Sequence, residues 1–258
     1  MTQLWYRESG LEEGPSVVFL HGLFASMQNW QGIVKRLVHD FHVFNVDLPN
    51  HGNSLHTEAV DYMDMRDRVI QLLDSEDVPT PVNLVGHSMG GKVAMMVALA
   101  RPDLVSKLLV EDMAPKEYPQ WFAPIIYSLI NVNLSKYKSR LEVDDALAPE
   151  ITDANLRMFL MTNLVRAEDK SFRWRVNLDA MVKGGPSIAG FPDVSGQNTL
   201  PMLVVRGSLS PYVDEGDLPL FQKYFPNAEL KTVVGADHWV HARDAEAFLG
   251  HLLGFLGR

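Results

Sequence analysis

Short apolar runs alternate with amphipathic segments along most of the chain. Runs of strand length lie at residues 16–20, 41–48, 82–85, 106–110, 202–205 and 229–234. Segments with apolar residues at helical spacing follow most of these runs and lie at residues 28–38, 61–73, 92–100, 217–224 and 244–256. Strands that alternate with helices predict parallel strands with right-handed crossovers, and therefore a mostly parallel α/β sheet flanked by helices. Ligands of such sheets bind beyond the carboxyl ends of the strands, so the residues that follow each run are candidates for a site.

The pattern changes between residues 116 and 192, where apolar residues recur at helical spacing without strands of the preceding kind. This segment predicts a mostly helical insertion, and because it leaves from the carboxyl end of a strand, we expect it to form a cap over the site. The predicted organisation is a core made of residues 1–115 and 193–258 and a helical cap made of residues 116–192. In the alternative, these helices simply pack on the sheet.

Composition limits the classes of function. The 258 residues fit one large domain or a domain with an insertion, and 47% of them are hydrophobic, which is enough for a packed core. The formal net charge of -9 argues against nucleic acid or an anionic membrane as a partner. The chain contains no cysteine, which excludes disulfides and cysteine-ligated zinc and agrees with a cytoplasmic location. The N-terminal residues lack the pattern of a signal peptide, and no apolar run approaches the ~18 residues of a membrane span.

The apolar run Val82–Val85 leads into Gly86-His87-Ser88-Met89-Gly90, and a helix is predicted directly afterwards. A strand, Gly-x-Ser-x-Gly and a helix in this order form a nucleophile elbow. The turn is so tight that the serine backbone is strained, and side chains at the two glycine positions would collide with the strand or the helix. Ser88 is therefore expected to project from the carboxyl end of the sheet, close to a helix N-terminus that favours negative charge. A plain strand-to-helix turn is the alternative.

Four segments together carry a family resemblance. They are His21-Gly22 after a strand, Gly86-His87-Ser88-Met89-Gly90, Asp112-Met113-Ala114-Pro115 and the segment from Gly235 to His238. With them the chain resembles the α/β-hydrolases, and among these it is similar to the small bacterial esterases of the YbfF type. The resemblance spans nearly the whole chain outside the predicted cap and implies an α/β-hydrolase fold with a serine nucleophile. It is much less specific for the substrate than for the fold.

A serine hydroxyl is a poor nucleophile at neutral pH and needs a base within hydrogen-bonding distance. His238 lies in a glycine-containing loop directly after the last predicted strand, and the family order also places the base there. His241, three residues later, is the alternative. His21 and His87 are expected to hold loops through hydrogen bonds. His51 is expected to lie at the surface or to pack within a loop.

The base requires a carboxylate that fixes its tautomer and stabilises the imidazolium. The commoner hydrolase pattern has an aspartate after the next strand of the core, about where Ser210 stands here, and serine cannot carry the charge. Members of the YbfF-like group use the position of Asp112, so the resemblance assigns the acid to Asp112, with Asp214 as the alternative. Strand alternation points Glu111 to the opposite side. Asp237 is too close in sequence to support its neighbour, and we expect it to be a solvated turn residue.

The negative oxygen of a tetrahedral intermediate needs hydrogen-bond donors that already point at it. The amide that follows the nucleophile, from Met89, is one expected donor. The second is expected from the loop after His21-Gly22, with the Leu23 N–H preferred and the Phe24 N–H as the alternative. Both donors are backbone groups, so the side chains at these positions shape the pocket more than they affect catalysis.

These residues predict a carboxylesterase that cleaves small to medium acyl esters through a triad of Ser88, His238 and Asp112 and an acyl-enzyme intermediate. The expected partner is a small-molecule ester or thioester, no metal or cofactor is required, and the chain is expected to be a monomer or a homodimer. Acyl-thioesterase, lactonase, perhydrolase and carbon–carbon bond hydrolase activities stay open on the same triad. Dehalogenases and epoxide hydrolases use an aspartate where Ser88 stands, which disfavours them. A catalytically silent ligand-binding protein of the same fold is the alternative from a different class.

Overall fold

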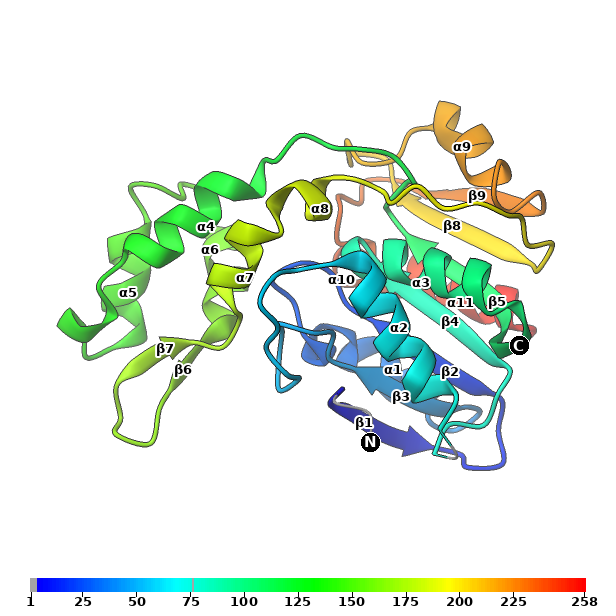
Figure 1. The fold of residues 1–258 in the computed structure, drawn as a ribbon, viewed down its shortest axis with the longest axis horizontal. Coiled ribbons are helices and arrows are strands. Elements are labelled where there is room, and N and C mark those ends of the chain that lie inside the picture. Colours follow the sequence, from blue (N-terminus) through cyan, green and yellow to red (C-terminus); the bar gives the residue numbers. More distant parts are fainter. Residues whose placement is uncertain (1–3, 76) are drawn as a thin grey trace.

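The computed structural model describes residues 4–75 and 77–258, so the first three residues of the N-terminal pattern lie outside the described residues (Figure 1). Its centre is a seven-stranded sheet in the order β1-β3-β2-β4-β5-β8-β9, in which β1 pairs antiparallel and the other neighbours pair parallel. The strands are β1 (Tyr6–Gly10), β2 (Ser16–Leu20), β3 (His42–Val46), β4 (Val82–His87), β5 (Val105–Glu111), β8 (Met202–Gly207) and β9 (Ala228–Val233). The predicted mostly parallel α/β sheet is confirmed.

Helices cover both faces of this sheet because its central strands are apolar on both sides. The core helices are α1 (Gln31–Leu37), α2 (Tyr62–Leu73), α3 (Met89–Ala100), α9 (Leu218–Gln222), α10 (Val240–Arg243) and α11 (Ala245–Leu256). On one face Leu84 belongs to the apolar cluster of α2 and α3, and on the other Val85 belongs to that of α1 and α11. None of the described helices combines the length and the apolar composition that crossing a bilayer requires.

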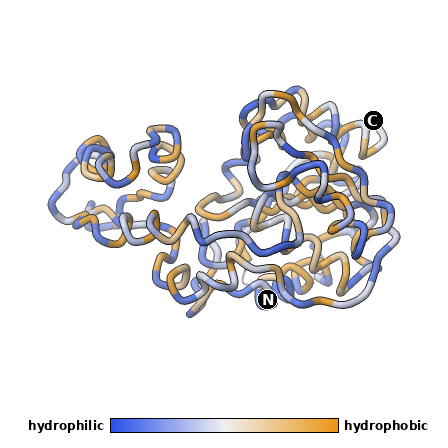
Figure 2. The backbone as a smooth tube through the Cα atoms, turned by 90° about the horizontal axis from the view of Figure 1, so that it is seen from above, coloured by the Kyte–Doolittle hydropathy of each residue, from blue (hydrophilic) through white to orange (hydrophobic). Residues whose placement is uncertain are grey.

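The segment between β5 and β8 forms a lobe beside the core, at the left of Figure 1, and Figure 2 shows from above that its tip stands away from the core. The elements of this lobe are α4 (Phe122–Asn131), α5 (Arg140–Leu147), α6 (Ala154–Leu160), β6 (Leu164–Arg166), β7 (Phe172–Trp174), α7 (Leu178–Lys183) and α8 (Gly185–Ala189). The helices match the helical spacing of the sequence. The antiparallel hairpin of β6 and β7 was not expected, because strands of three residues are too short to show a period. The core and cap boundaries at residues 116 and 192 stay a prediction.

Three turns that follow core strands meet at one edge of the sheet. Ser88 follows β4, Asp112 follows β5, and His238 lies between β9 and α10. Strands β4 and β5 are parallel neighbours whose register pairs His87 with Glu111, directly before the first two of these turns. The hydrogen bonds of the sheet therefore set the spacing between Ser88 and Asp112.

Candidate active site

The turn at Ser88 has the strained geometry of an elbow. The Ser88 backbone has φ 52° and ψ -119°, which is outside the common regions for a residue with a side chain. A Cβ atom at Gly86 would lie 2.4 Å from the carbonyl oxygen of Gly90, and one at Gly90 would lie 2.5 Å from the carbonyl oxygen of Leu20. The expectation that both glycines are required for steric reasons is therefore confirmed. Ser88 is held by its N–H, which donates to the carbonyl of Glu111 at 3.1 Å.

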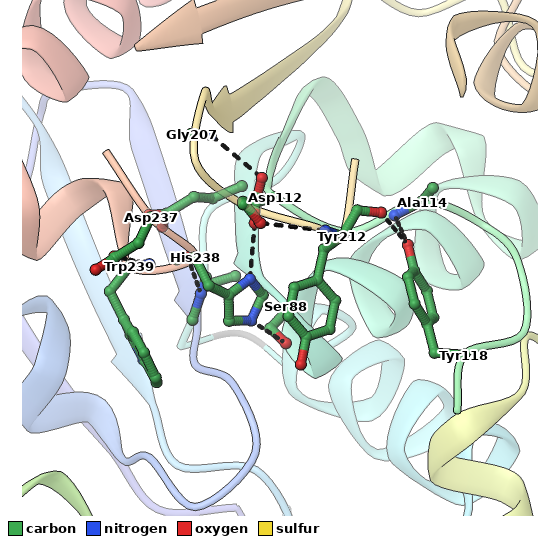
Figure 3. A network of polar contacts seen from close by, with 12 residues as sticks. Ser88, Asp112, Ala114, Tyr118, Gly207, Tyr212, Asp237, His238 and Trp239 are labelled. Carbon is green, nitrogen blue, oxygen red and sulfur yellow. Dashed lines mark hydrogen bonds and ion pairs between the residues drawn. The ribbon is translucent and has the colours of Figure 1, made fainter. Parts of the chain in front are cut away.

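A chain of hydrogen bonds joins the three residues that were predicted to act together (Figure 3). His238 Nε2 lies 3.0 Å from Ser88 Oγ, and His238 Nδ1 lies 2.7 Å from Asp112 Oδ2. The carboxylate of Asp112 is fully buried, while the His238 side chain is buried except for a small edge. With the proton on Nδ1 facing the carboxylate, Nε2 is free to accept the proton of the serine hydroxyl.

The other candidates for base and acid have different partners. Asp214 accepts the Gly216 N–H at 2.8 Å and caps a short helical turn, and among the described residues its carboxylate has no histidine as a hydrogen-bond partner. Asp237 accepts the Trp239 N–H at 3.0 Å and is half-buried, so it is a turn residue as expected but only partly solvated. His241 is hydrogen-bonded to Glu111 and lies away from the serine hydroxyl. Only His238 is thus placed to take the serine proton within the described part of the chain.

Ser210 supports the carboxylate from the position where the commoner pattern has an aspartate. Its hydroxyl donates a hydrogen bond to Asp112 Oδ2, and the Gly207 N–H donates to Asp112 Oδ1 at 3.2 Å. The Tyr212 N–H in turn donates to Ser210 Oγ at 3.2 Å. The ring of Tyr212 stacks on His238 with 3.9 Å between the ring centres. The loop after β8 therefore holds both the acid and the base, although it contributes neither.

The loop after β2 lies close to Ser88, since a Cβ atom at Gly22 would lie 3.2 Å from Ser88 Cβ. The Phe24 N–H donates to His51 Nε2 at 3.2 Å, so it is not available to a substrate oxygen. The structure shows no hydrogen bond from the Leu23 N–H to another described residue. Met89 is the first residue of α3, where an N–H has no carbonyl within the helix to bind. These positions agree with Leu23 and Met89 as the pair of donors, which stays a prediction.

Two buried histidines hold this loop in their neutral form. His21 Nδ1 donates to the Gly22 carbonyl at 2.8 Å, and His21 Nε2 accepts the Leu48 N–H at 2.9 Å. His51 Nδ1 donates to the Pro49 carbonyl at 2.9 Å, which leaves Nε2 as the acceptor for Phe24. Burial lowers the pKa of His21 to about 4 and that of His51 to about 3. Of the two expected positions for His51, packing within a loop is the one the structure shows, because the side chain is fully buried beneath the β2 loop.

A second pair of an acid and a histidine lies beside the first. Both oxygens of Glu111 accept the Nδ1–H of His241, at 2.9 and 2.8 Å, and one of them also accepts the His241 N–H at 2.7 Å. His87 Nε2 donates to the carbonyl of His238 at 3.0 Å. Burial, and then the neighbouring His238 and His241, lower the pKa of His87 well below its usual value. These contacts fix the loop that carries the base at two points, and Glu111 points to the opposite side from Asp112, as expected.

His87, Glu111 and His241 also form the one group of possible metal ligands found within the described residues. The ligand atoms of His87, Glu111 and His241 lie within 4.8 Å of one another, and all three side chains are buried. The carboxylate oxygens already accept hydrogen bonds from His241. The arrangement in the structure is therefore that of a hydrogen-bonded support.

A small cavity adjoins Ser88 on the side of the lobe. Its walls include Leu23 and Met89 from the core, and Tyr118, Phe122 and Ile188 from the chain between β5 and β8. The volume of this cavity is about 30 Å³. Lys92 also lines this cavity, although its side chain is almost fully buried.

Comparisons with known proteins identify relatives over most of the chain. The sequence profile of the alpha/beta hydrolase family matches residues 17–250. The chain is 35% identical over 251 residues to the sn-1-specific diacylglycerol lipase ABHD11 of Xenopus laevis. This alignment covers 94% of this chain and 80% of that protein. It is 30% identical over 241 residues to the esterase YbfF of Escherichia coli, covering 93% and 92% of the two chains. The solved structure of a marine microorganism esterase superposes with a TM-score of 0.94 at 36% identity, over 99% of this chain and 100% of that one.

Proposed function

Because the chain belongs to the alpha/beta hydrolase family, we propose that it is a serine carboxylesterase that cleaves small to medium acyl esters. The observation that carries this proposal is the hydrogen-bonded chain from Ser88 through His238 to Asp112. The names of the relatives, two esterases and a lipase, support ester bonds as the substrate class.

The first half of the reaction acylates Ser88. The hydroxyl proton moves to His238 Nε2 while Oγ bonds to the ester carbonyl carbon, and the carbonyl electrons move to its oxygen. The N–H groups of Leu23 and Met89 are the proposed donors to that oxygen. The intermediate collapses when the bond to the alcohol breaks and His238 gives its proton to the departing oxygen. Asp112 stabilises the imidazolium that exists between these two proton transfers.

The second half returns the enzyme to its starting state. A water molecule gives a proton to His238 Nε2 and bonds through its oxygen to the acyl carbon. The second tetrahedral intermediate then releases Ser88 Oγ, which takes the proton back from the imidazolium. The products are one acid and one alcohol, and the chain ends with the same protonation it had at the start.

The test is the loss of hydrolysis in Ser88→Ala. We expect the variant to lose turnover of p-nitrophenyl acetate to the background rate and to lose labelling by a fluorophosphonate, while its circular dichroism spectrum stays that of the wild type. Ser195→Ala is a matched control, because Ser195 is exposed in the loop before β8. Hydrolysis by Ser88→Ala at the wild-type rate would remove Ser88 from the mechanism. A wild-type protein without hydrolysis and without labelling would instead be the silent ligand-binding protein.

A further inference from the structure

We propose that Lys92 closes the inner end of the acyl-binding cavity and thereby restricts the enzyme to esters of short, unsubstituted acyl chains. The proposal rests on the proposed function, because it takes the cavity beside Ser88 as the place where the acyl group lies. The proposal names the substrate class for that same site.

The position of Lys92 on α3 sets the length of this cavity. Ser88 and Lys92 are four residues apart, and the Lys92 N–H donates to the Ser88 carbonyl at 3.2 Å, so they lie on the same side of one helical turn. Four residues of α-helix rise about 6 Å. An acyl chain that starts at Ser88 and follows α3 therefore meets the Lys92 side chain after a few carbon atoms. The cavity volume of about 30 Å³ is small beside the about 300–1,000 Å³ of pockets for drug-sized ligands, which agrees with a short acyl chain.

The Lys92 side chain is held in place by the end of α8. Its Nζ donates to the carbonyl oxygens of Ala189 at 3.1 Å and Gly190 at 2.5 Å, and lies 3.4 Å from that of Ile188. Carbonyl groups at the end of a helix have no N–H partner within it, so Lys92 supplies the donors they lack. The centres of the Tyr62 and Tyr118 rings lie 5.5 and 5.0 Å from Nζ.

An alkyl chain cannot easily displace this side chain. Moving Lys92 aside would leave the buried carbonyl oxygen of Ala189 without its donor, and an unpaired buried carbonyl is unfavourable. The Tyr62 hydroxyl also donates to the Ile188 carbonyl, at 3.2 Å, and holds the same turn of chain. The inner wall is therefore fixed by polar contacts rather than by apolar packing that can shift.

The contacts of Lys92 also decide which chemistry of acyl group fits. An ammonium group has three N–H donors, and three carbonyl oxygens lie within 3.4 Å of Nζ. Burial lowers the pKa of Lys92 to about 7, so the neutral amine with fewer donors is also populated near neutral pH. In neither state is a donor left for a carboxylate or hydroxyl on the acyl chain. The remaining walls are largely apolar, which suits plain alkyl chains.

The experiment compares p-nitrophenyl esters of acetate, butyrate, octanoate and laurate. For the wild type we expect kcat/KM to fall at least tenfold between butyrate and octanoate. Lys92→Ala removes the inner wall and should raise the ratio of octanoate to butyrate kcat/KM at least tenfold. Lys107→Ala is the matched control, because Lys107 Nζ donates to the Phe255 and Leu256 carbonyls at the end of another helix, α11. It should leave the ratio of octanoate to butyrate kcat/KM unchanged.

A second variant covers the case in which Lys92→Ala does not fold. Ile188→Ala enlarges the same cavity from the lobe side and should also raise the octanoate to butyrate ratio. The proposal is overturned if the wild type hydrolyses octanoate as fast as butyrate. It is also overturned if folded Lys92→Ala keeps the wild-type ratio, or if Lys107→Ala changes the ratio as much. Each of these results can be observed only if the enzyme hydrolyses esters through Ser88. The absence of all hydrolysis is a different result and would reject the proposed function itself.

Discussion

Replacing Asp112 by asparagine tests the acid of the triad without changing its shape. The carboxylate accepts the Gly207 N–H on Oδ1, and the Ser210 hydroxyl and the His238 Nδ1–H on Oδ2. An asparagine side chain has one acceptor oxygen, which still accepts the Gly207 N–H. The NH₂ group of the asparagine therefore faces His238 Nδ1. The imidazole then has to carry its proton on Nε2, where it points at Ser88 Oγ and cannot accept the serine proton.

The expected loss follows from the geometry of this pair. Two unit charges at the observed 2.7 Å interact with about 6 kcal/mol at an effective dielectric constant of about 20. This is the interaction that the imidazolium loses when the partner becomes neutral. It corresponds to a loss of between about 10⁴ and 10⁵ in rate, at 1.36 kcal/mol for each factor of ten. A loss of about 10⁴ is also typical of removing the acid from a triad by this substitution.

The assay is the hydrolysis of p-nitrophenyl acetate at pH 8, with the folded fraction measured by circular dichroism. We expect kcat of Asp112→Asn to fall about 10⁴-fold, with KM changed little because the substrate does not contact the acid. Asp214→Asn is the control, and its kcat should stay within about twofold of the wild type because Asp214 only caps a turn. A kcat of Asp112→Asn within tenfold of the wild type would refute the reasoning, and so would a large loss in Asp214→Asn alone.

Three further predictions concern the supports of the site. Adding Ser210→Asp to Asp112→Asn places a carboxylate beside the same ring, and it should recover kcat at least tenfold over Asp112→Asn; no recovery would show that the loop after β8 cannot present an acid. Glu111→Gln breaks a fully buried pair, so urea titration should show a free energy of unfolding lower by about 3 kcal/mol, and an unchanged midpoint would contradict this role. His51 takes up a proton in the unfolded chain near its usual pKa of 6.5 but only near 3 in the folded chain, so the contribution of His51 to stability should fall by about 1.4 kcal/mol per pH unit as pH drops below 6.5. His51→Gln should reduce that slope between pH 6 and 4 in urea titrations, and an identical slope would exclude His51 as its source.

Much of the fold follows from local patterns in the sequence. Most buried strands and the helices that follow them are visible as an apolar run and a helical period, and the elbow requires two glycines because a Cβ atom at either position would collide with the backbone. The hairpin of β6 and β7 escaped prediction because its strands are short and its register depends on tertiary packing.

Some residues of the candidate site could be predicted from the sequence, and others could not. Ser88 and His238 are identified by motif and by their place after a strand, and the identity of Ser210 shows that the acid lies elsewhere. The burial of His51 depends on the β2 loop, which is 27 residues away in sequence. The contacts of Lys92 come from carbonyl groups 96 to 98 residues downstream. Lys92 was not predicted from the sequence; a charged residue within an apolar helix is the signal that could have identified it, but no local rule identifies its partners.

The position of the acid directly after β5 has a consequence for how this enzyme can diversify. Nucleophile and acid are attached to adjacent strands, so their separation is fixed by the register of β4 and β5. The loop after β8 therefore does not have to supply the carboxylate. Its Ser210 hydroxyl instead donates a hydrogen bond to the carboxylate of Asp112. Tyr212 in the same loop lines the cavity beside Ser88. Substitutions in this loop can therefore alter the cavity during evolution while the spacing of Ser88 and Asp112 stays set by the sheet, and a change at Tyr212 also removes the ring that stacks on His238.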